Sequence, residues 1–335
     1  MKMSLPCLTR LTRLTRLTRL IMAGLFAGLP AFAGAQQSYP SKPIRFITPY
    51  APGGSTSIVA RYIGEKFTES WGQPVIIDSR GGANTMIGTD IVAKAAPDGY
   101  TIIYTAMTHV VIPQFLPAPY DPIKDFAAVA SFDNAEEILV VHPAVPANNL
   151  REFIALAKSR PGEINYASAG AGGVNHLAGE FFNIAAGVKL QHIPYKGAAP
   201  AMTDLMGGQV HASFAVPINA ITLIKNGKLK GIAVSGKTRM QALPQLPTFA
   251  ESGLSGYDPG FWRGVMAPAG TPRSIIDKLS TEMARMLTLP DIREKLQSQG
   301  LDPFTTTPEQ FAELMKSDMA KYGRVIKLAG IKIEN

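Results

Sequence analysis

The sequence predicts an α/β protein of two lobes, with the second lobe inserted into the first and two crossover strands acting as the hinge of a clamshell. Short apolar segments alternate with segments of helical spacing from residue 43 to residue 235, which is typical of parallel sheets covered by helices. Roughly 300 residues follow the leader described below, a length that usually divides into two domains. After residue 270 the pattern is mainly helical and predicts a tail that completes the first lobe.

The first 35 residues have the order of regions found in a secretory signal peptide. Five basic residues precede an apolar run over residues 20–29, and Ala33-Gly34-Ala35 follows. We expect cleavage near Ala35 and Gln36 and export to the periplasm. A membrane anchor is the alternative, but the apolar segment contains Gly and Pro and is shorter than the roughly 20 residues that span a bilayer.

Removal of the leader changes what the mature chain can do. The single cysteine, Cys7, lies in the leader, so we expect no disulfide and no cysteine-based metal or redox chemistry. The leader also carries five of the 33 basic residues and none of the 25 acidic ones, so the formal charge falls from +8 to +3. This weak bias, without Lys/Arg clusters among aromatic residues, predicts no nucleic-acid partner.

The first lobe begins with a β-α-β-α-β pattern. Strands are expected over 43–49, 74–78 and 100–105, with helices over 57–69 and 87–95 and a Gly/Asn-rich loop over 80–84. A Pro-rich loop then leads to a strand over 138–141, and we place the first crossover near 131–137. The predicted domains are 36–134 together with 260–335 for lobe 1, and 135–259 for lobe 2.

The second lobe repeats the strand-helix unit. Asn149 followed by Glu152 predicts a capped helix start. Strands are expected over 165–168, 190–194, 210–216 and 231–235, with helices over 175–186, 200–206 and 219–226. The chain returns to the first lobe around 256–265. Helices then follow over 274–287, 290–300 and 307–329, the last capped by Thr307-Pro308-Glu309-Gln310.

Two glycine-rich loops follow strands at equivalent places in the two lobes. They are Pro52-Gly53-Gly54-Ser55-Thr56-Ser57 and Ser168-Ala169-Gly170-Ala171-Gly172-Gly173. Ligands of open α/β sheets bind beyond the carboxyl ends of strands, where glycines let the backbone approach and hydroxyls donate to an anion. Tight turns with helix caps are the alternative. Neither loop has the spacing of a P-loop, a dinucleotide fingerprint or a nucleophile elbow.

The five histidines show no spacing typical of a metal site, so no metal is expected. We place His109 and His176 in loops at the cleft as candidate ligand contacts, with capping or solvation as the alternative. The other three, His142, His192 and His211, are assigned to the scaffold.

Six motifs, in unbroken order over about residues 38–335, resemble the extracytoplasmic receptors of tripartite tricarboxylate transporters, or Bug receptors. The motifs are Tyr50-Ala51-Pro52-Gly53-Gly54-Ser55-Thr56, residues 80–87, Ala96-Pro97-Asp98-Gly99-Tyr100-Thr101, Asn165-Tyr166-Ala167-Ser168-Ala169-Gly170, His192-Ile193-Pro194-Tyr195-Lys196-Gly197 and Ala267-Pro268-Ala269-Gly270-Thr271-Pro272.

The resemblance implies a type II periplasmic binding fold that holds a small carboxylate, such as citrate, an amino acid, nicotinate or an aromatic acid. Partners would be integral membrane transporter subunits, with no cofactor and no catalytic residue, and we expect a monomer. One ligand carboxylate would lie between the two loops, held partly by backbone amides and water. The residues implied for this role are Gly53, Gly54, Ser55, Thr56, Ser168, Ala169 and Gly172.

The chain departs from the family pattern at Ser57 and at Ala215-Val216-Pro217, where many members have an acidic residue. Loss of acidic partners disfavours an amino-acid ligand. Phe261 and Trp262, at the second crossover, offer an aromatic wall, with core packing as the alternative. We therefore expect an aromatic mono- or dicarboxylate of the benzoate, phthalate or terephthalate type. Ser57, Asn84, Pro217 and Trp262 complete the candidate ligand-binding residues.

Two other functions stay open on the sequence. One is a secreted hydrolase of small esters or amides, although no nucleophile has an evident base. The other is a ligand-sensing partner of a membrane kinase, which would use the same cleft.

Overall fold

The computed structural model describes residues 39–50, 52, 55–298 and 300–331, and its main compact unit begins at Lys42. The predicted signal peptide therefore lies outside the described residues. Within the main unit, a six-stranded sheet in the order β11-β4-β10-β3-β1-β2 forms the centre of the first lobe. Its strands are β1 (Ile44–Thr48), β2 (Val75–Ser79), β3 (Thr101–Ala106), β4 (Phe126–Ala135), β10 (Phe261–Pro268) and β11 (Leu301–Pro303).

Helices surround this sheet. They are α2 (Ser55–Trp71), the short 3-10 helix η1 (Ala83–Thr85), α3 (Met86–Ala93), α4 (Thr108–Val111), the 3-10 helix η2 (Ile112–Gln114), α9 (Arg273–Met286) and α10 (Pro290–Ser298). Helix α2 packs on β1, β2 and α9. Its buried face includes Val59, Ile63 and Phe67, which recur at the spacing that puts side chains on one side of a helix.

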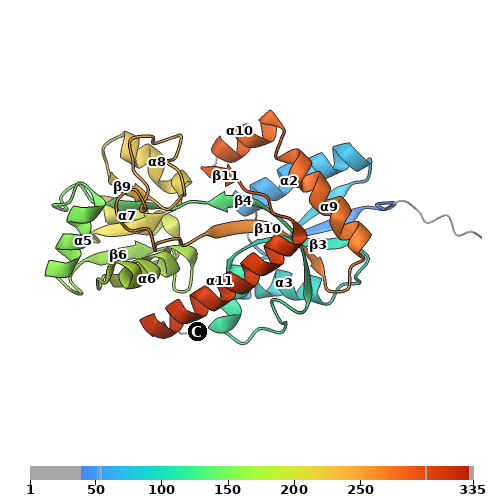
Figure 1. The fold of residues 1–335 in the computed structure, drawn as a ribbon, viewed down its shortest axis with the longest axis horizontal. Coiled ribbons are helices and arrows are strands. Elements are labelled where there is room, and N and C mark those ends of the chain that lie inside the picture. The colour runs from blue at the N-terminus through green and yellow to red at the C-terminus, as the bar shows by residue number, and fades with distance from the viewer. Residues whose placement is uncertain (1–38, 51, 53–54, 299, 332–335) are drawn as a thin grey trace, which may run out of the picture. The chain divides into compact units, whose positions relative to one another are not determined.

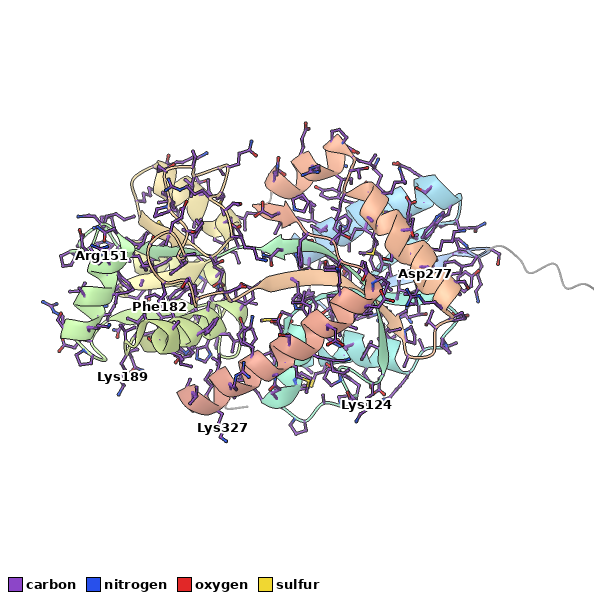
Figure 2. All side chains as sticks on the ribbon, in the orientation of Figure 1. Lys124, Arg151, Phe182, Lys189, Asp277 and Lys327 are labelled. Atoms are coloured by element: carbon purple, nitrogen blue, oxygen red, sulfur yellow. The ribbon has the colours of Figure 1, made fainter. Side chains whose placement is uncertain are left out.

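The second lobe has a five-stranded sheet in the order β7-β6-β8-β5-β9. Its strands are β5 (Ile138–Val141), β6 (Asn165–Ser168), β7 (Gln191–Pro194), β8 (Ala212–Ala215) and β9 (Lys230–Val234). Its helices are α5 (Leu150–Ser159), α6 (Val174–Ala186), α7 (Ala198–Met206) and α8 (Pro217–Lys225). An aromatic core fills one side of the sheet, where Phe182 lies near Phe153 and Phe214. Figure 2 shows Phe182 inside the lobe, whereas Lys124, Arg151, Lys189, Asp277 and Lys327 point outward.

Two long strands lead from one lobe to the other (Figure 1). Strand β4 passes into β5 through Glu136 and Glu137, and the chain returns after β9 to enter β10 at Phe261. Helix α11 (Pro308–Ala329) contacts β4 and α4 in the first lobe and α6 in the second. The predicted two-lobed clamshell is therefore confirmed. The residue at which each lobe ends stays a prediction.

Local capping follows the sequence. The side chain of Asn149 accepts a hydrogen bond from the backbone N–H of Glu152 at 3.0 Å, and Thr307 and Gln310 form a reciprocal capping box at the start of α11.

The sheets are mixed, which the sequence pattern did not predict. Strand β10 runs antiparallel to β3 and β4, and β5 runs antiparallel to β8 and β9. The long strand β4 begins in the predicted loop and overlaps the predicted crossover near 131–137, and β11 lies between the helices predicted over 290–300 and 307–329. Strand β4 has small and polar residues without clear alternation, and β11 has only three residues, so neither gave a periodic signal.

Candidate functional site

A cavity of about 420 Å³ lies between residues of the two lobes, within the size range of small-molecule sites. We call its two sides the first wall and the second wall. The first wall consists of Tyr50, Ser55, Thr56, Asn84, Thr85, Ala106, Thr108, Ile112, Ala135, Phe261, Arg263 and Leu301. The second wall consists of Ala169, Gly170, Ala171, Gly172, Gly173, Val174, Asn175, Val216, Pro217 and Ile218.

Three helices begin at this cavity. Helix α2 starts at Ser55, α6 at Val174 and α8 at Pro217, and none has an acidic residue in its first turn. No side chain caps the start of α6 or α8. The first N–H groups of a helix have no partner within it, and the helix dipole makes this end positive. The three helix starts therefore favour an anion in the cavity.

Arg263 is the charged residue among the described residues that line the cavity. Its Nε donates to Oδ1 of Asp133 at 2.6 Å, and its Nη1 donates to Oγ of Ser55 at 2.7 Å. The hydroxyl of Tyr104 donates to the other oxygen of Asp133. Burial alone would lower the pKa of Arg263, but the negative charge of Asp133 raises it above its ordinary value. The guanidinium is therefore held charged and in a fixed position.

Sequence reasoning missed Arg263 and placed Trp262 at the cleft instead. Successive side chains of a strand point to opposite faces, so Phe261 and Arg263 share the face that meets the cavity. Trp262 points the other way, is 1% exposed, and donates from Nε1 to Oδ2 of Asp318 at 2.8 Å. Core packing, the alternative for Trp262, is what the structure shows. The alternation of β10 was the signal that could have found Arg263.

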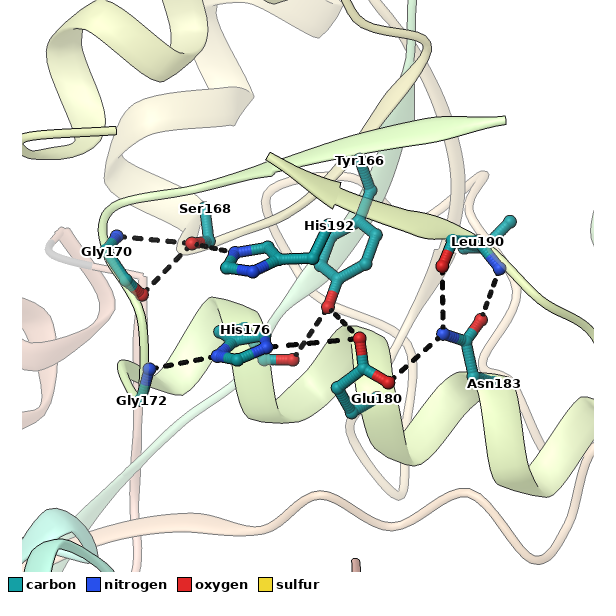
Figure 3. Close-up of polar contacts among 9 residues, drawn as sticks. All are labelled: Tyr166, Ser168, Gly170, Gly172, His176, Glu180, Asn183, Leu190 and His192. Atoms are coloured by element: carbon teal, nitrogen blue, oxygen red, sulfur yellow. Dashed lines mark hydrogen bonds and ion pairs between the residues drawn. The ribbon is translucent and has the colours of Figure 1, made fainter. Parts of the chain in front are cut away.

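The loop after β6 lines the cavity with residues 169–173, and a cluster of polar contacts holds this loop in place (Figure 3). Ser168 is 1% exposed, and its Oγ lies 2.6 Å from Nε2 of His192. The backbone N–H of Gly172 donates to Nδ1 of His176 at 2.9 Å. The rings of His176 and His192 stack with centroids 3.7 Å apart. This cluster fixes the loop from the side away from the ligand.

Two predicted contacts in the second lobe are corrected by this arrangement. His176 lies within α6 and Ser168 is buried, and neither lines the cavity. Burial lowers the pKa of His176 to about 4, so the ring is neutral at pH 7 and its Nδ1 can accept. Ala169 and Gly172 do line the cavity, but the N–H of Gly172 is directed to His176. The first turn of α6 is the better donor set.

Two predicted contacts in the first lobe are corrected as well. His109, which we placed in a loop, lies in α4, is fully buried, and has Nε2 2.8 Å from the carbonyl of Pro122. Ser57 is buried on the inner face of α2. Neither residue lines the cavity. For Ser57 the reason is that a helix beginning at Ser55 turns its third residue toward the sheet. Gly53 and Gly54 lie outside the described residues.

Six of the predicted contacts line the cavity: Ser55, Thr56, Asn84 and Pro217, in addition to Ala169 and Gly172. Asn84 belongs to a run with positive φ, which is 44° at Ala83, 51° at Asn84 and 76° at Thr85. Such conformations cost roughly 1–3 kcal/mol each and gather at functional sites. The Gly/Asn-rich loop predicted over 80–84 overlaps this run, but positive φ at Ala83 and Thr85 was not predicted, because neither residue is of a type that favours it.

A hydrolase would need a nucleophile beside a base, and the structure brings Oγ of Ser168 within 2.6 Å of Nε2 of His192. That contact lies behind the loop, with Ser168 buried and absent from the cavity lining. Within residues 39–50, 52, 55–298 and 300–331, no cluster of three or more His, Cys, Asp or Glu residues is suited to a metal ion. Nor does any described helix have the length and apolar character needed to cross a membrane.

Comparison with known proteins gives consistent results. Residues 59–331 match the model of the tripartite tricarboxylate transporter family receptor. Protein BugT of Bordetella pertussis is 34% identical over 321 residues, which cover 94% of this chain and 98% of BugT.

Solved structures show the same relationship. The periplasmic binding protein BugD is 34% identical with a TM-score of 0.72, covering 88% of this chain and 100% of BugD. A Rhodopseudomonas palustris protein solved with adipate is 32% identical with a TM-score of 0.75, covering 88% and 99%. MatC from Rhodopseudomonas palustris, solved with malate, is 31% identical with a TM-score of 0.71, covering 86% and 100%.

Family members are periplasmic binding proteins that bind small carboxylates, and the folds of the relatives agree with the two lobes described above. The chain belongs to the tripartite tricarboxylate transporter receptor family, the Bug receptors.

Proposed function

We propose that this receptor closes its lobes around one small organic carboxylate in the periplasm and delivers it to integral membrane transporter subunits, without chemistry of its own. One observation carries the choice of an anion. Three helix starts and Arg263 meet at a cavity whose described lining contains no Asp or Glu. A carboxylate that leaves water must regain hydrogen bonds, and this lining offers donors from both walls.

The body of the ligand is apolar, and we favour an aromatic acid of the benzoate, phthalate or terephthalate type. Tyr50, Phe261 and Leu301 on the first wall and Val216 and Ile218 on the second wall supply apolar surface. A flat ring suits such a lining. The absence of an acidic group among the described lining residues disfavours an α-amino acid, because its ammonium would lack a partner. Two relatives were solved with the dicarboxylates adipate and malate.

We propose that the predicted signal peptide directs export of this protein to the periplasm. We propose that the mature protein begins near Gln36, and an intact mass measured on periplasmic protein tests this. A mass that includes the leader would contradict it.

Titration calorimetry with benzoate, phthalate, terephthalate, adipate, aspartate and glutamate tests the ligand class. We expect saturable binding of aromatic acids, with the two amino acids weaker by at least about tenfold, the factor that corresponds to one lost charge-assisted contact. Small-angle scattering on the same samples should show compaction on binding, because a ligand that bridges both walls favours the closed state.

Tight binding of glutamate or aspartate without response to any aromatic acid would overturn the aromatic proposal. Absence of binding by every carboxylate would overturn the receptor's proposed ligand class.

A further inference from the structure

Arg263 is buried, yet part of its hydrogen-bonding capacity is unused. The residue is 5% exposed and lines the cavity. A guanidinium has five N–H donors. Nε and Nη1 donate to Asp133 and Ser55, whereas Nη2 lies 2.5 Å from Oδ1 of Asp133 as an ion pair but has no hydrogen-bond partner among the described residues. Nη2 lies against Asp133, which does not line the cavity, so the donor left for a ligand acceptor is the second N–H of Nη1, which neither Asp133 nor Ser55 uses.

The guanidinium is held in place from the side away from the cavity. Asp133 is fully buried on β4 and is in turn bonded by the hydroxyl of Tyr104, which is also fully buried. Neither Asp133 nor Tyr104 lines the cavity. Both therefore act as positioning residues that orient the fork, while Arg263 alone presents charge to the ligand. Arginine forks match the geometry of a carboxylate, to which they can donate two parallel bonds.

The second wall holds an anion by other means. Its donors are the N–H groups in the first turn of α6 and the N–H of Ile218 in α8, both in the opposite lobe from Arg263. In α8, Pro217 has no N–H and the N–H of Asn219 donates to the carbonyl of Val216 at 3.0 Å. Two separate donor sets thus face one cavity, one on each lobe. A ligand with a single carboxylate can satisfy only one of them, whereas a ligand with a carboxylate at each end can satisfy both.

We propose that Arg263 is the residue that makes this receptor select dicarboxylates over monocarboxylates, by anchoring one carboxylate while the starts of α6 and α8 hold the other. This inference rests on the proposed function and adds to it the number of charges on the ligand. Before a ligand binds, the ion pair with Asp133 holds the guanidinium in position and neutralises its buried charge.

The test uses ligand pairs that differ by one carboxylate: terephthalate against benzoate, and adipate against hexanoate. Calorimetry is performed on the wild-type receptor, on Arg263→Gln and on Arg263→Lys. We expect the wild-type receptor to bind each dicarboxylate at least about tenfold more tightly than its partner. In Arg263→Gln this ratio should fall to within about threefold, and in Arg263→Lys it should be intermediate, because an ammonium keeps the charge but not the fork.

Two further variants keep the result interpretable. Arg45→Gln removes a half-exposed arginine that pairs with Asp78 outside the cavity. In this variant the ratio of dicarboxylate to monocarboxylate affinity should equal that of the wild type. The double variant Arg263→Gln/Asp133→Asn removes both charges of the pair, so a loss of selectivity there cannot arise from an unpaired buried carboxylate. Near-ultraviolet circular dichroism confirms that each variant is folded.

The results distinguish failure of the role proposed for Arg263 from failure of the proposed carboxylate-binding function. Equal wild-type affinity for the members of each pair, or an unchanged ratio in folded Arg263→Gln, would overturn the role of Arg263 while leaving a carboxylate receptor in place. Failure of all four acids to bind the wild-type receptor would overturn both the proposed function and this inference.

Discussion

The first and second walls of the cavity both favour an anion, but they do so with different parts of the chain. The first wall presents the guanidinium of Arg263, which needs Asp133 and Tyr104 behind it. The second wall presents the glycine-rich loop after β6 and the starts of α6 and α8, and the cluster of Ser168, His176 and His192 does not line the cavity.

The comparison shows where each wall is vulnerable. A buried charge has lost its hydration and depends strongly on its counter-ion, whereas partial charges at helix starts need no counter-ion. Changes behind the first wall should therefore damage folding, and changes behind the second wall should mainly alter the position of a loop.

The largest effect is expected from Asp133→Ala. The substitution leaves Arg263 buried without its counter-ion, so the free energy of unfolding should fall by about 3–5 kcal/mol. Urea unfolding at pH 7 measures this. Asp78→Ala is the matched control, because Asp78 pairs with Arg45 and Arg80 near the surface, where ion pairs contribute about 0–1 kcal/mol. Equal losses in the two variants would show that the first wall does not depend on a buried charge.

The crossover between the walls offers a second test through pH. Glu136 is 3% exposed at the end of β4, and Gly236 leaves room for it, since a Cβ there would lie 1.6 Å from its Oε1. Burial, together with a hydrogen bond to Asp302, raises the pKa of Glu136 to about 9. A carboxyl whose pKa is raised by folding stabilises fully below its ordinary pKa, and this contribution is lost as pH rises toward 9.

The expected result is that wild-type stability falls between pH 5 and pH 8, with a contribution from Glu136 on the order of 1 kcal/mol per pH unit. Glu136→Gln should reduce this slope. It should not abolish it, because burial also raises the pKa of Glu137. Urea midpoints at pH 5, 6, 7 and 8 provide the measurement. An identical slope in the variant would mean that Glu136 is ionised in the folded protein.

A third test concerns direct contact between the lobes. Gly300 has φ of +68°, and a Cβ there would lie 2.3 Å from Cβ of Pro217 at the start of α8. Gly72 has φ of +67° with no neighbouring atom within 4 Å of its Cβ position. Alanine at either position should cost roughly 1–2 kcal/mol of stability from the left-handed backbone. Only Gly300→Ala should also weaken terephthalate binding, because it separates the walls. Equal affinities for terephthalate in the two variants would contradict this contact's role in closure.

The sequence predicted the lobes, the order of most elements and the two loops, because these depend on hydrophobic periodicity and on glycine-rich turns. The sequence analysis did not predict that the side chains of two neighbouring residues point in opposite directions. Phe261 and Trp262 were placed together at the cleft, although a strand turns one of them inward. Asp133, which fixes Arg263, is 130 residues away from it along the chain, and no local pattern connects the two.

The position of His176 in the structure differs from the predicted one for a related reason. His176 was expected to contact the ligand because it follows a glycine-rich loop. The structure turns it behind that loop, where it accepts a hydrogen bond from Gly172 and stacks on His192. Its influence on a ligand would therefore be indirect, through the position of the backbone.

The smallest effect tests this indirect role on the second wall. His176→Phe keeps a flat ring against His192 but removes the acceptor for the Gly172 N–H, so the loop loses one hydrogen bond, a contribution of about 1 kcal/mol. We expect terephthalate affinity to fall by roughly fivefold. His211→Phe is the matched control, since Nδ1 of His211 accepts from the backbone N–H of Asn165 at 3.0 Å outside the cavity. Calorimetry should show unchanged affinity in this control, with both variants similarly destabilised in urea. If His176→Phe binds terephthalate as tightly as the wild type, the glycine loop holds its position without the histidine, and the second wall depends on its helix starts alone.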